Sequence, residues 1–334
     1  MLRFTRPLAA GLLTALFSFS AAQAGVGEAI EQHILPRHTA FAKAAEALST
    51  QAKADCTATA MQPAYNAAFD GWIGVQHLAL GPLQDLGGPL ALGFWPDAKG
   101  FTPRQLTALL KAKTPDATTP QGFSHQSIAV QGFFALERML YDDALSSYTK
   151  GSYSCAVVQA MARDIAQKAT TLATNWPAHA TLLLTAGDAG NATYLSRDEA
   201  AQALFTALVS GIEYNDYVRL ARPLGSFERP RPTRAEAWRS DRTQRNLALS
   251  LAALDEFAVK LSDGAATETH KLFTDARAWL ANLDEPRFAG VADPVARMGI
   301  ESLTSYLDLL KETAAAEVGD HLGVGQGFNA LDGD

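Results

Sequence analysis

Apolar residues recur every three or four positions through most of this chain, in segments dominated by Ala and Leu. That spacing places them on one side of an α-helix, whereas a half-buried strand would alternate apolar and polar residues. The sequence contains no run of strict alternation bounded by turn residues, so an all-α fold is predicted. The expected helices span residues 27–54, 60–80, 102–113, 124–143, 153–185, 197–221, 234–262, 266–282 and 293–317.

Glycine and proline divide these helices into two groups. The Gly-containing segment 187–191 separates four or five expected helices from the four that follow it. A second break, at 222–233, contains three prolines and is typical of a rigid linker. Helices joined in this way pack most readily as antiparallel neighbours. We therefore expect two antiparallel helical bundles, at residues 25–187 and 188–334.

The first 24 residues have the three parts of a secretory signal peptide. Arg3 and Arg6 precede an apolar run, and Ala22-Gln23-Ala24 forms an A-x-A cleavage site. The apolar run is too short to span a bilayer, and no later stretch has the roughly 18 uninterrupted apolar residues of a membrane helix. The alternative is a structural first helix or a retained anchor. We expect cleavage of residues 1–24 and a periplasmic protein with no membrane anchor.

Charge and cysteine content narrow the classes of function. The 28 Lys and Arg residues are outnumbered by 35 Asp and Glu, which gives a net charge of −7. This balance argues against a nucleic-acid partner, because phosphates require clustered positive charge. Cys56 and Cys155 are too few for a disulfide scaffold or a four-cysteine zinc site. In an oxidising compartment they form either one disulfide across a long loop or two partly buried thiols.

The seven histidines form no recognisable metal-binding pattern. None belongs to an H-E-x-x-H motif, and no two lie at positions i and i+4 of one helix. Phosphate-binding glycine loops, C-x-x-C motifs and nucleophile elbows are also absent from the sequence. Motifs of common catalytic sites therefore give no prediction of an enzyme.

The helix expected around 131–141 carries the most informative polar residue, Glu137. The apolar face of this helix consists of Phe133, Leu136 and Leu140. Gly132 would let another helix backbone approach closely, and Glu137 lies beside the apolar face. Glu137 is therefore either partly buried, and in need of donors, a cation or a proton, or paired with Arg138 at the surface.

A second polar cluster, residues 236–242, lies at the start of the helix expected at 234–262. Arg239 and Arg242 are three positions apart and would share one helix face. There they could form a fork for a carboxylate or a propionate-like anion. The alternative is a solvated helix start held by i, i+4 pairs.

Taken in order along the chain, several short motifs resemble the imelysin family, also classed as M75 peptidases. These motifs are Ile34-Leu35-Pro36 with Cys56, Trp72 with Gln76, Gly81-Pro82, Phe94-Trp95-Pro96-Asp97, residues 236–242, and the tail from Leu322 to Asp334. The resemblance covers nearly all of the chain that follows residue 24. It implies an exported, all-helical bacterial protein with two four-helix-type bundles, a pocket between them, and a link to iron or haem acquisition.

The hallmark of that family, G-x-H-x-x-E, aligns with residues 132–137. Gly132 and Glu137 match the motif, but Phe134 occupies the histidine position. His and Glu at positions i and i+3 can bind one metal ion together, whereas phenylalanine has no lone pair. We therefore expect no zinc site. A metallopeptidase of the M75 type would have to combine Glu137 with a distant histidine such as His77 or His125.

The favoured function is a non-catalytic binding or accessory protein of bacterial iron or haem acquisition, with iron or haem as the ligand. The expected ligand contacts are Gly132, Phe134, Glu137, Glu236, Arg239, Ser240 and Arg242. Phe134 either lines an apolar wall of the pocket or belongs to the ordinary core. The expected protein partners are uptake proteins of the cell envelope. The alternatives are a metallopeptidase with a degenerate metal site and a structural protein that docks a cell-envelope partner.

Overall fold

The computed structural model describes residues 21–325, and all regular elements within this range are helical. The prediction of an all-α fold is confirmed. The expected signal peptide lies outside the described residues, apart from the backbone of residues 21–24. Residues 326–334 of the tail also lie outside them.

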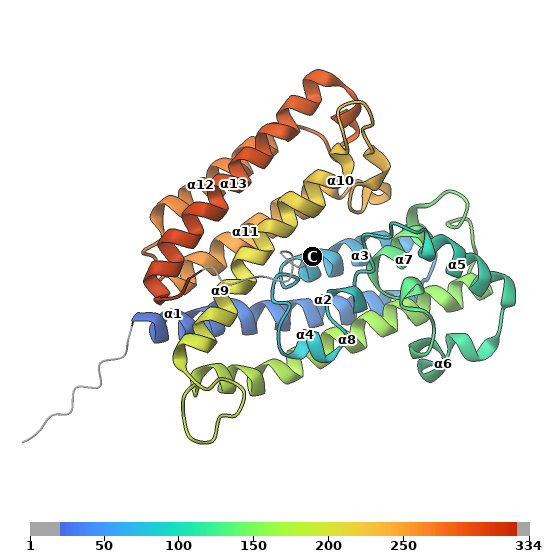
Figure 1. The fold of residues 1–334 in the computed structure, drawn as a ribbon. Coiled ribbons are helices and arrows are strands. Elements are labelled where there is room, and N and C mark those ends of the chain that lie inside the picture. The colour runs from blue at the N-terminus through green and yellow to red at the C-terminus, as the bar shows by residue number, and fades with distance from the viewer. Residues whose placement is uncertain (1–20, 326–334) are drawn as a thin grey trace, which may run out of the picture.

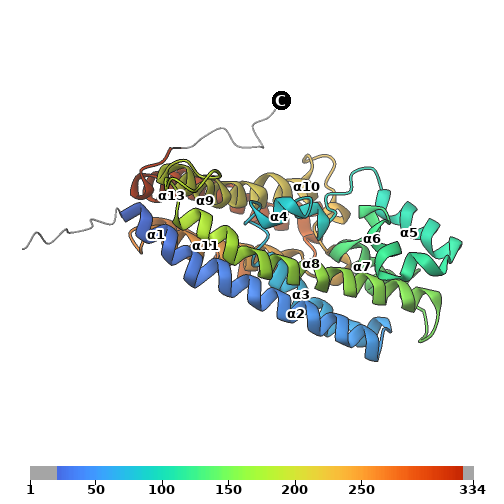
Figure 2. The ribbon, with the colours of Figure 1, turned by 90° about the horizontal axis from the view of Figure 1, so that it is seen from below.

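The first bundle is built around one long helical rod. This rod consists of α1 (Ala21–Ala29), a π-helical turn η1 (Ile30–Ile34) and α2 (Leu35–Ala54), and is blue in Figures 1 and 2. The α2 helix packs against α3 (Ala58–Ile73) and α8 (Tyr153–Leu184), and α7 (Gly132–Tyr141) packs against both of these. The long connection from α3 to α7 contains α4 (Pro82–Asp85), η2 (Pro89–Ala91), α5 (Phe101–Ala112), η3 (Pro115–Thr118), α6 (Pro120–Ser124) and η4 (Ile128–Val130).

The second bundle contains α9, α11, α12 and α13, which span Arg197–Glu213, Thr243–Leu261, Thr267–Ala281 and Pro294–Leu322. The α9 helix continues through a second π-helical turn, η5 (Tyr214–Leu220), into α10 (Ala221–Leu224). Side chains fix two helix starts: Ser196 accepts a hydrogen bond from the Glu199 N–H, and Asp293 accepts from two N–H groups of α13. The shorter elements are η6 (Pro232–Arg234), η7 (Trp238–Ser240) and η8 (Ala289–Ala292).

The two bundles share the long first helix. Its N-terminal part, α1, lies against α9, α11 and α13, whereas α2 belongs to the first bundle (Figure 1). The buried apolar residues of both bundles form one continuous cluster, because α1 links their cores. The expectation of two helical bundles is confirmed, and the boundary at residue 187 stays a prediction.

Three expected helices, at 60–80, 124–143 and 234–262, are too long at one end. The first stops at Ile73 instead of residue 80, the second starts at Gly132 instead of 124, and the third starts at Thr243 instead of 234. Left-handed backbone explains two of these errors. Gly132 has a φ of 71°, and Ala237 and Asp241 have φ values of 49° and 57°, which a continuous right-handed helix does not accommodate.

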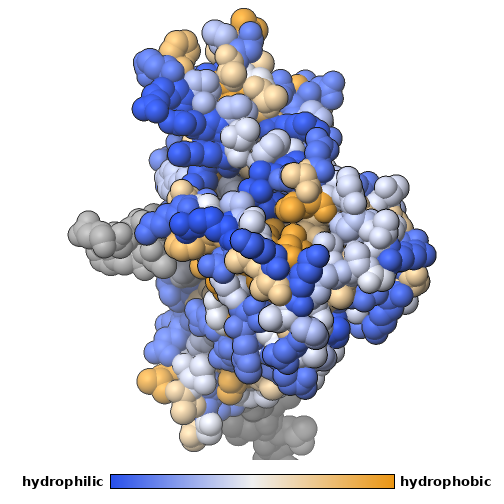
Figure 3. Space-filling model, turned by 90° about the vertical axis from the view of Figure 1, so that its right-hand side faces the viewer, coloured by the Kyte–Doolittle hydropathy of each residue, from blue (hydrophilic) through white to orange (hydrophobic). Residues whose placement is uncertain are grey.

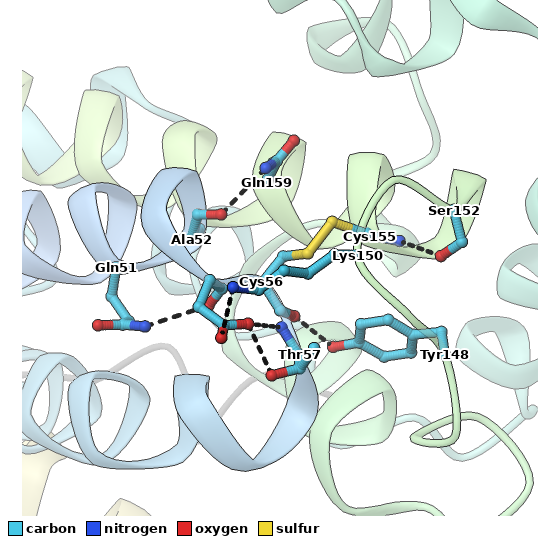
Figure 4. The surroundings of a disulfide bond; sticks show 10 residues. Gln51, Ala52, Cys56, Thr57, Tyr148, Lys150, Ser152, Cys155 and Gln159 are labelled. Atoms are coloured by element: carbon cyan, nitrogen blue, oxygen red, sulfur yellow. Dashed lines mark hydrogen bonds and ion pairs between the residues drawn. A yellow bond between two sulfur atoms is a disulfide. The ribbon is translucent and has the colours of Figure 1, made fainter.

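A disulfide joins Cys56, between α2 and α3, to Cys155, in the first turn of α8 (Figure 4). Their Cα atoms are 5.5 Å apart and 99 positions separate them in sequence. The Tyr148 hydroxyl donates a 2.9 Å hydrogen bond to the Cys56 carbonyl, and Gln159 donates one to Ala52. Of the two states open from the sequence, the structure has the disulfide, which fastens the ends of α2 and α8 together.

Candidate functional site

A pocket of about 160 Å³ opens between the two bundles, at the end of the molecule that Figure 3 views. Its walls come from the loop after η2, from α7, from α10 and from the segment that precedes α11. They include four aromatic residues, four arginines and two carboxylates: Phe94, Trp95, Phe134, Trp238, Arg138, Arg222, Arg234, Arg239, Asp97 and Glu137. The pocket is therefore aromatic and carries an excess of positive charge.

Glu137 is the buried carboxylate of this pocket, with only 3% of its surface exposed. Its Oε1 accepts hydrogen bonds from the Ser240 hydroxyl, at 2.7 Å, and from the Ser240 backbone N–H, at 3.1 Å. Burial raises the pKa of Glu137, while the Ser240 bonds and the Arg239 charge oppose that rise. Of the two alternatives, Glu137 is therefore buried. Its bonds to Ser240 hold the 236–242 segment of the second bundle against α7.

A close backbone contact sets the position of α7. The N–H of Phe133 donates a 2.8 Å hydrogen bond to the carbonyl of Leu92, and a Cβ atom at residue 132 would overlap that carbonyl. Gly132 therefore admits the backbone of the loop after η2. The prediction that another helix backbone approaches Gly132 is wrong, because the neighbour is a loop. This contact is structural, and it sets where Phe134 and Glu137 enter the pocket.

Phe134 lines the pocket and is also part of the core, with 7% of its surface exposed. Its ring stacks against Trp95 at a centroid distance of 6.0 Å and meets Phe69 edge-on at 5.4 Å. The indole N–H of Trp72 is buried nearby, with no hydrogen-bond partner among the described residues. A Cβ atom at Gly93 would lie 3.3 Å from that nitrogen and 3.2 Å from the Phe134 ring. Phe134 therefore gives the site an apolar wall, at a place where a hydrogen-bonding side chain could pair with the Trp72 N–H.

The 236–242 segment is irregular, so the predicted arginine fork is wrong. Arg239 donates a 3.3 Å hydrogen bond to Asp142 and lies over the Trp238 ring, 4.2 Å from its centroid. Arg242 instead bonds to Asp70 and to Asn66 of α3. The left-handed residues within the segment turn these two side chains toward different partners. Of the pair, only Arg239 lines the pocket.

Glu236 belongs to a buried polar network beside the pocket. Arg219, in the η5 turn, donates to both Glu236 oxygens and to Gln76 at 2.6 Å. Asn246 donates to the same carboxylate at 3.0 Å. Glu236 and Arg242 are therefore structural neighbours of the pocket, since neither side chain lines it.

Arg222 and Arg234 are pocket residues that the sequence did not reveal, since Arg222 lies in the predicted linker 222–233 and Arg234 starts the helix predicted at 234–262. Arg222 is half-buried, with its guanidinium 5.9 Å from the centroid of the Trp95 ring. Arg234 lies in an exposed position at the pocket rim. A cluster of arginines in the proline-containing segment was the only sequence signal for them.

Comparisons with known proteins show the family of this chain. The imelysin family model, which is the M75 peptidase family, matches residues 34–314. The chain belongs to the imelysin family. It is 25% identical to iron-regulated protein A of Synechococcus elongatus, with 88% of this chain and 82% of that protein covered.

Two solved structures share the imelysin fold with this chain. An imelysin-like protein from Psychrobacter arcticum superposes with a TM-score of 0.77 at 18% identity, covering 93% of this chain and 98% of that one. A putative iron-regulated protein A precursor from Parabacteroides distasonis gives 0.70 at 12% identity, with coverages of 90% and 95%. At these identities the likeness shows the fold alone.

The residues present do not suit the metal ion that the imelysin hallmark implies. Phe134 presents only carbon, and one Glu137 oxygen is already occupied by Ser240. Within residues 21–325, no three His, Cys, Asp or Glu side chains converge into a metal-binding group. His125 is exposed at the end of α6, and His77 faces His33 with their Nε2 atoms 3.1 Å apart. Neither histidine is a hydrogen-bond partner of Glu137.

Membrane topology was also predicted from the sequence. In the described part of the imelysin chain, no helix combines the length and apolar character needed to cross a bilayer.

Proposed function

We propose that this imelysin-family protein is an exported, non-catalytic binding or accessory component of bacterial iron or haem acquisition, acting through the pocket around Glu137. The single observation that carries the proposal is the buried Glu137 carboxylate, which joins the two bundles through Ser240 at the wall of an aromatic, arginine-lined cavity. Such a site is suited to binding, because charged side chains and aromatic rings line one cavity between the two bundles.

The second oxygen of Glu137 gives the pocket a free polar group. Both Ser240 bonds end on Oε1, and no described residue forms a hydrogen bond with Oε2. Because Glu137 lies at the pocket wall, a ligand donor that reached Oε2 would form a charge-assisted hydrogen bond with it. Glu137 thus bonds to Ser240 through Oε1 and to a ligand through Oε2.

The surroundings of Glu137 suit an organic ligand better than a bare ion. Phe134, Trp95 and Trp238 offer ring faces, whereas a transition metal needs several nitrogen, oxygen or sulfur donors. A cavity of about 160 Å³ can take only the edge of a haem. Names of relatives give independent support for iron: the Synechococcus and Parabacteroides proteins are both called iron-regulated protein A.

Export is supported by the signal-peptide pattern of residues 1–24 and by the word precursor in the name of the Parabacteroides relative. We place the mature protein in the periplasm, where the disulfide is compatible with the redox conditions. Cell-envelope uptake proteins are the partners that this location and function would require.

The test is a titration of haemin and of ferric citrate into the mature protein, followed by absorbance and calorimetry. We expect saturable binding of at least one probe, and at least a tenfold loss of affinity, about 1.4 kcal/mol, in both Glu137→Ala and Glu137→Gln. Glu312→Ala changes an exposed carboxylate on α13 and serves as the control. If wild-type protein binds neither probe, or if chelator-sensitive peptide cleavage depends on Glu137, the proposal is wrong.

A further inference from the structure

Of the four arginines that line the pocket, two pair with a carboxylate and two do not. Arg138 and Arg239 both bond to Asp142, each at 3.3 Å. In contrast, no carboxylate among residues 21–325 forms a hydrogen bond or ion pair with Arg222 or Arg234. Burial and the nearby Arg234 charge both lower the pKa of Arg222. Two like charges facing one cavity would both be stabilised by an anion bound between them.

Besides Glu137, the pocket has one other carboxylate, and backbone groups already use it. Asp97 accepts hydrogen bonds from the N–H groups of Phe101 and Thr102, both at 2.8 Å, at the start of α5. It therefore stabilises the α5 N-terminus. An external carboxylate is the group whose geometry matches a guanidinium best.

Size and ring content limit what carries that carboxylate. A cavity of about 150 Å³ lined with apolar side chains is known to hold one benzene ring, and this one has about 160 Å³. Trp95 and Phe134 form a stacked pair on one wall, and Trp238 lies on another. Aromatic rings pack well against such walls in offset or edge-on arrangements. The cavity therefore has room for about one six-membered aromatic ring.

Glu137 adds a requirement for a hydrogen-bond donor on the same ligand. Its Oε2 can accept a hydrogen bond from a phenolic hydroxyl. No cationic ligand would suit this pocket, because four guanidiniums line it against two carboxylates.

We propose that the pocket binds a single-ring aromatic carboxylate that carries a phenolic hydroxyl, with Arg222 and Arg234 receiving the carboxylate and Glu137 receiving the hydroxyl. This inference rests on the proposed function, because benzoates hydroxylated next to the carboxylate chelate ferric iron. The ligand in this arrangement is the free acid, because iron chelation would remove the hydroxyl proton that Glu137 is to accept. The shared chemistry is the ring, the carboxylate and the hydroxyl.

The experiment titrates 2-hydroxybenzoate into the mature protein, with tryptophan fluorescence and calorimetry as readouts. Phenol lacks the carboxylate, and cyclohexanecarboxylate lacks the aromatic ring. We expect 2-hydroxybenzoate to bind at least tenfold more tightly than either. Arg222→Gln and Arg234→Gln should each weaken it at least fivefold, and together more. Arg104→Gln should leave affinity unchanged, because Arg104 lies over Phe101 and does not line the pocket.

Two outcomes overturn the inference: no binding of 2-hydroxybenzoate to wild type, or equal affinity for all three compounds. In a parallel titration, ferric 2-hydroxybenzoate should bind more weakly than the free acid, because it has no hydroxyl proton for Glu137. If haemin or ferric citrate binds through Glu137 while 2-hydroxybenzoate does not, the ligand class is wrong and the proposed function stands. If the free acid binds but no iron-containing probe does, the ligand class stands and the proposed function fails.

Discussion

The hydrogen bond from the Ser240 hydroxyl to Glu137 should stabilise the folded protein measurably. Ser240→Ala removes the 2.7 Å bond to Oε1 and leaves only the 3.1 Å bond from the backbone N–H. A hydrogen bond to a charged acceptor contributes roughly 1.5–3 kcal/mol, and the 3% exposure of Glu137 limits replacement by water. We therefore expect the free energy of unfolding to fall by about 2 kcal/mol at pH 8.

The pH dependence of this loss follows from the pKa of Glu137. Burial raises that pKa above its unfolded value, so the folded state binds this proton more tightly and loses stability as pH rises through the raised pKa. The Ser240 hydroxyl stabilises the ionised form. Its removal should therefore cost most at pH 8 and less at pH 4, where Glu137 is protonated and the bond is between neutral groups.

Urea unfolding followed by circular dichroism, at pH 8 and pH 4, measures both effects. Ser302→Ala is the matched control, because that hydroxyl bonds only to the Met298 carbonyl of its own helix. It should change stability by less than about 0.5 kcal/mol. In a Glu137→Gln background, the cost of Ser240→Ala should shrink. A cost at pH 8 no larger than that of the control, or one that Glu137→Gln leaves unchanged, would refute the reasoning.

Three further predictions concern the framework around the pocket. Gly132→Ala should destabilise the protein by about 2 kcal/mol more than Gly264→Ala. Both glycines have a positive φ, but only residue 132 lies against a neighbouring backbone. Equal losses of stability in urea unfolding would contradict the close contact. Replacing Cys56 and Cys155 with Ser should lower the free energy of unfolding by about 4–5 kcal/mol, and an unchanged thermal midpoint would contradict the bridge. Burial lowers the pKa of His38 from 6.5 to about 4, so this residue costs no stability above pH 6.5. The free energy of unfolding should fall by about 3 kcal/mol between pH 6.5 and 4. Urea titrations should show that this part of the pH dependence is lost in His38→Gln.

Sequence periodicity predicted the long helices well where local and tertiary preferences agree. The α8 and α9 helices begin within a residue of their predicted starts, because Ser152 and Ser196 cap them and the apolar face continues without a break. The prediction of a helix over residues 236–242 is wrong because of tertiary contacts. These residues favour helix locally, but the Glu236–Arg219 ion pair and the Ser240–Glu137 bonds hold them in an irregular path.

The pocket was only partly predictable from the sequence. Glu137 and Ser240 could be assigned to one site through the family resemblance, and Phe134 through its departure from the hallmark motif. Arg222 and Arg234 could not, since their role depends on α10 and η6 folding back toward the first bundle. Such long-range placement leaves no periodic signal in the chain.

We propose that the pocket around Glu137 binds an iron-related organic ligand and takes part in no metal-dependent chemistry. Elemental and absorbance analysis of the protein purified from its native cells is the decisive measurement. The account predicts iron or haem absorbance in the wild-type protein, its loss in Glu137→Gln, and no stoichiometric zinc in either. A stoichiometric zinc ion in the wild type, lost in Glu137→Gln, would contradict it.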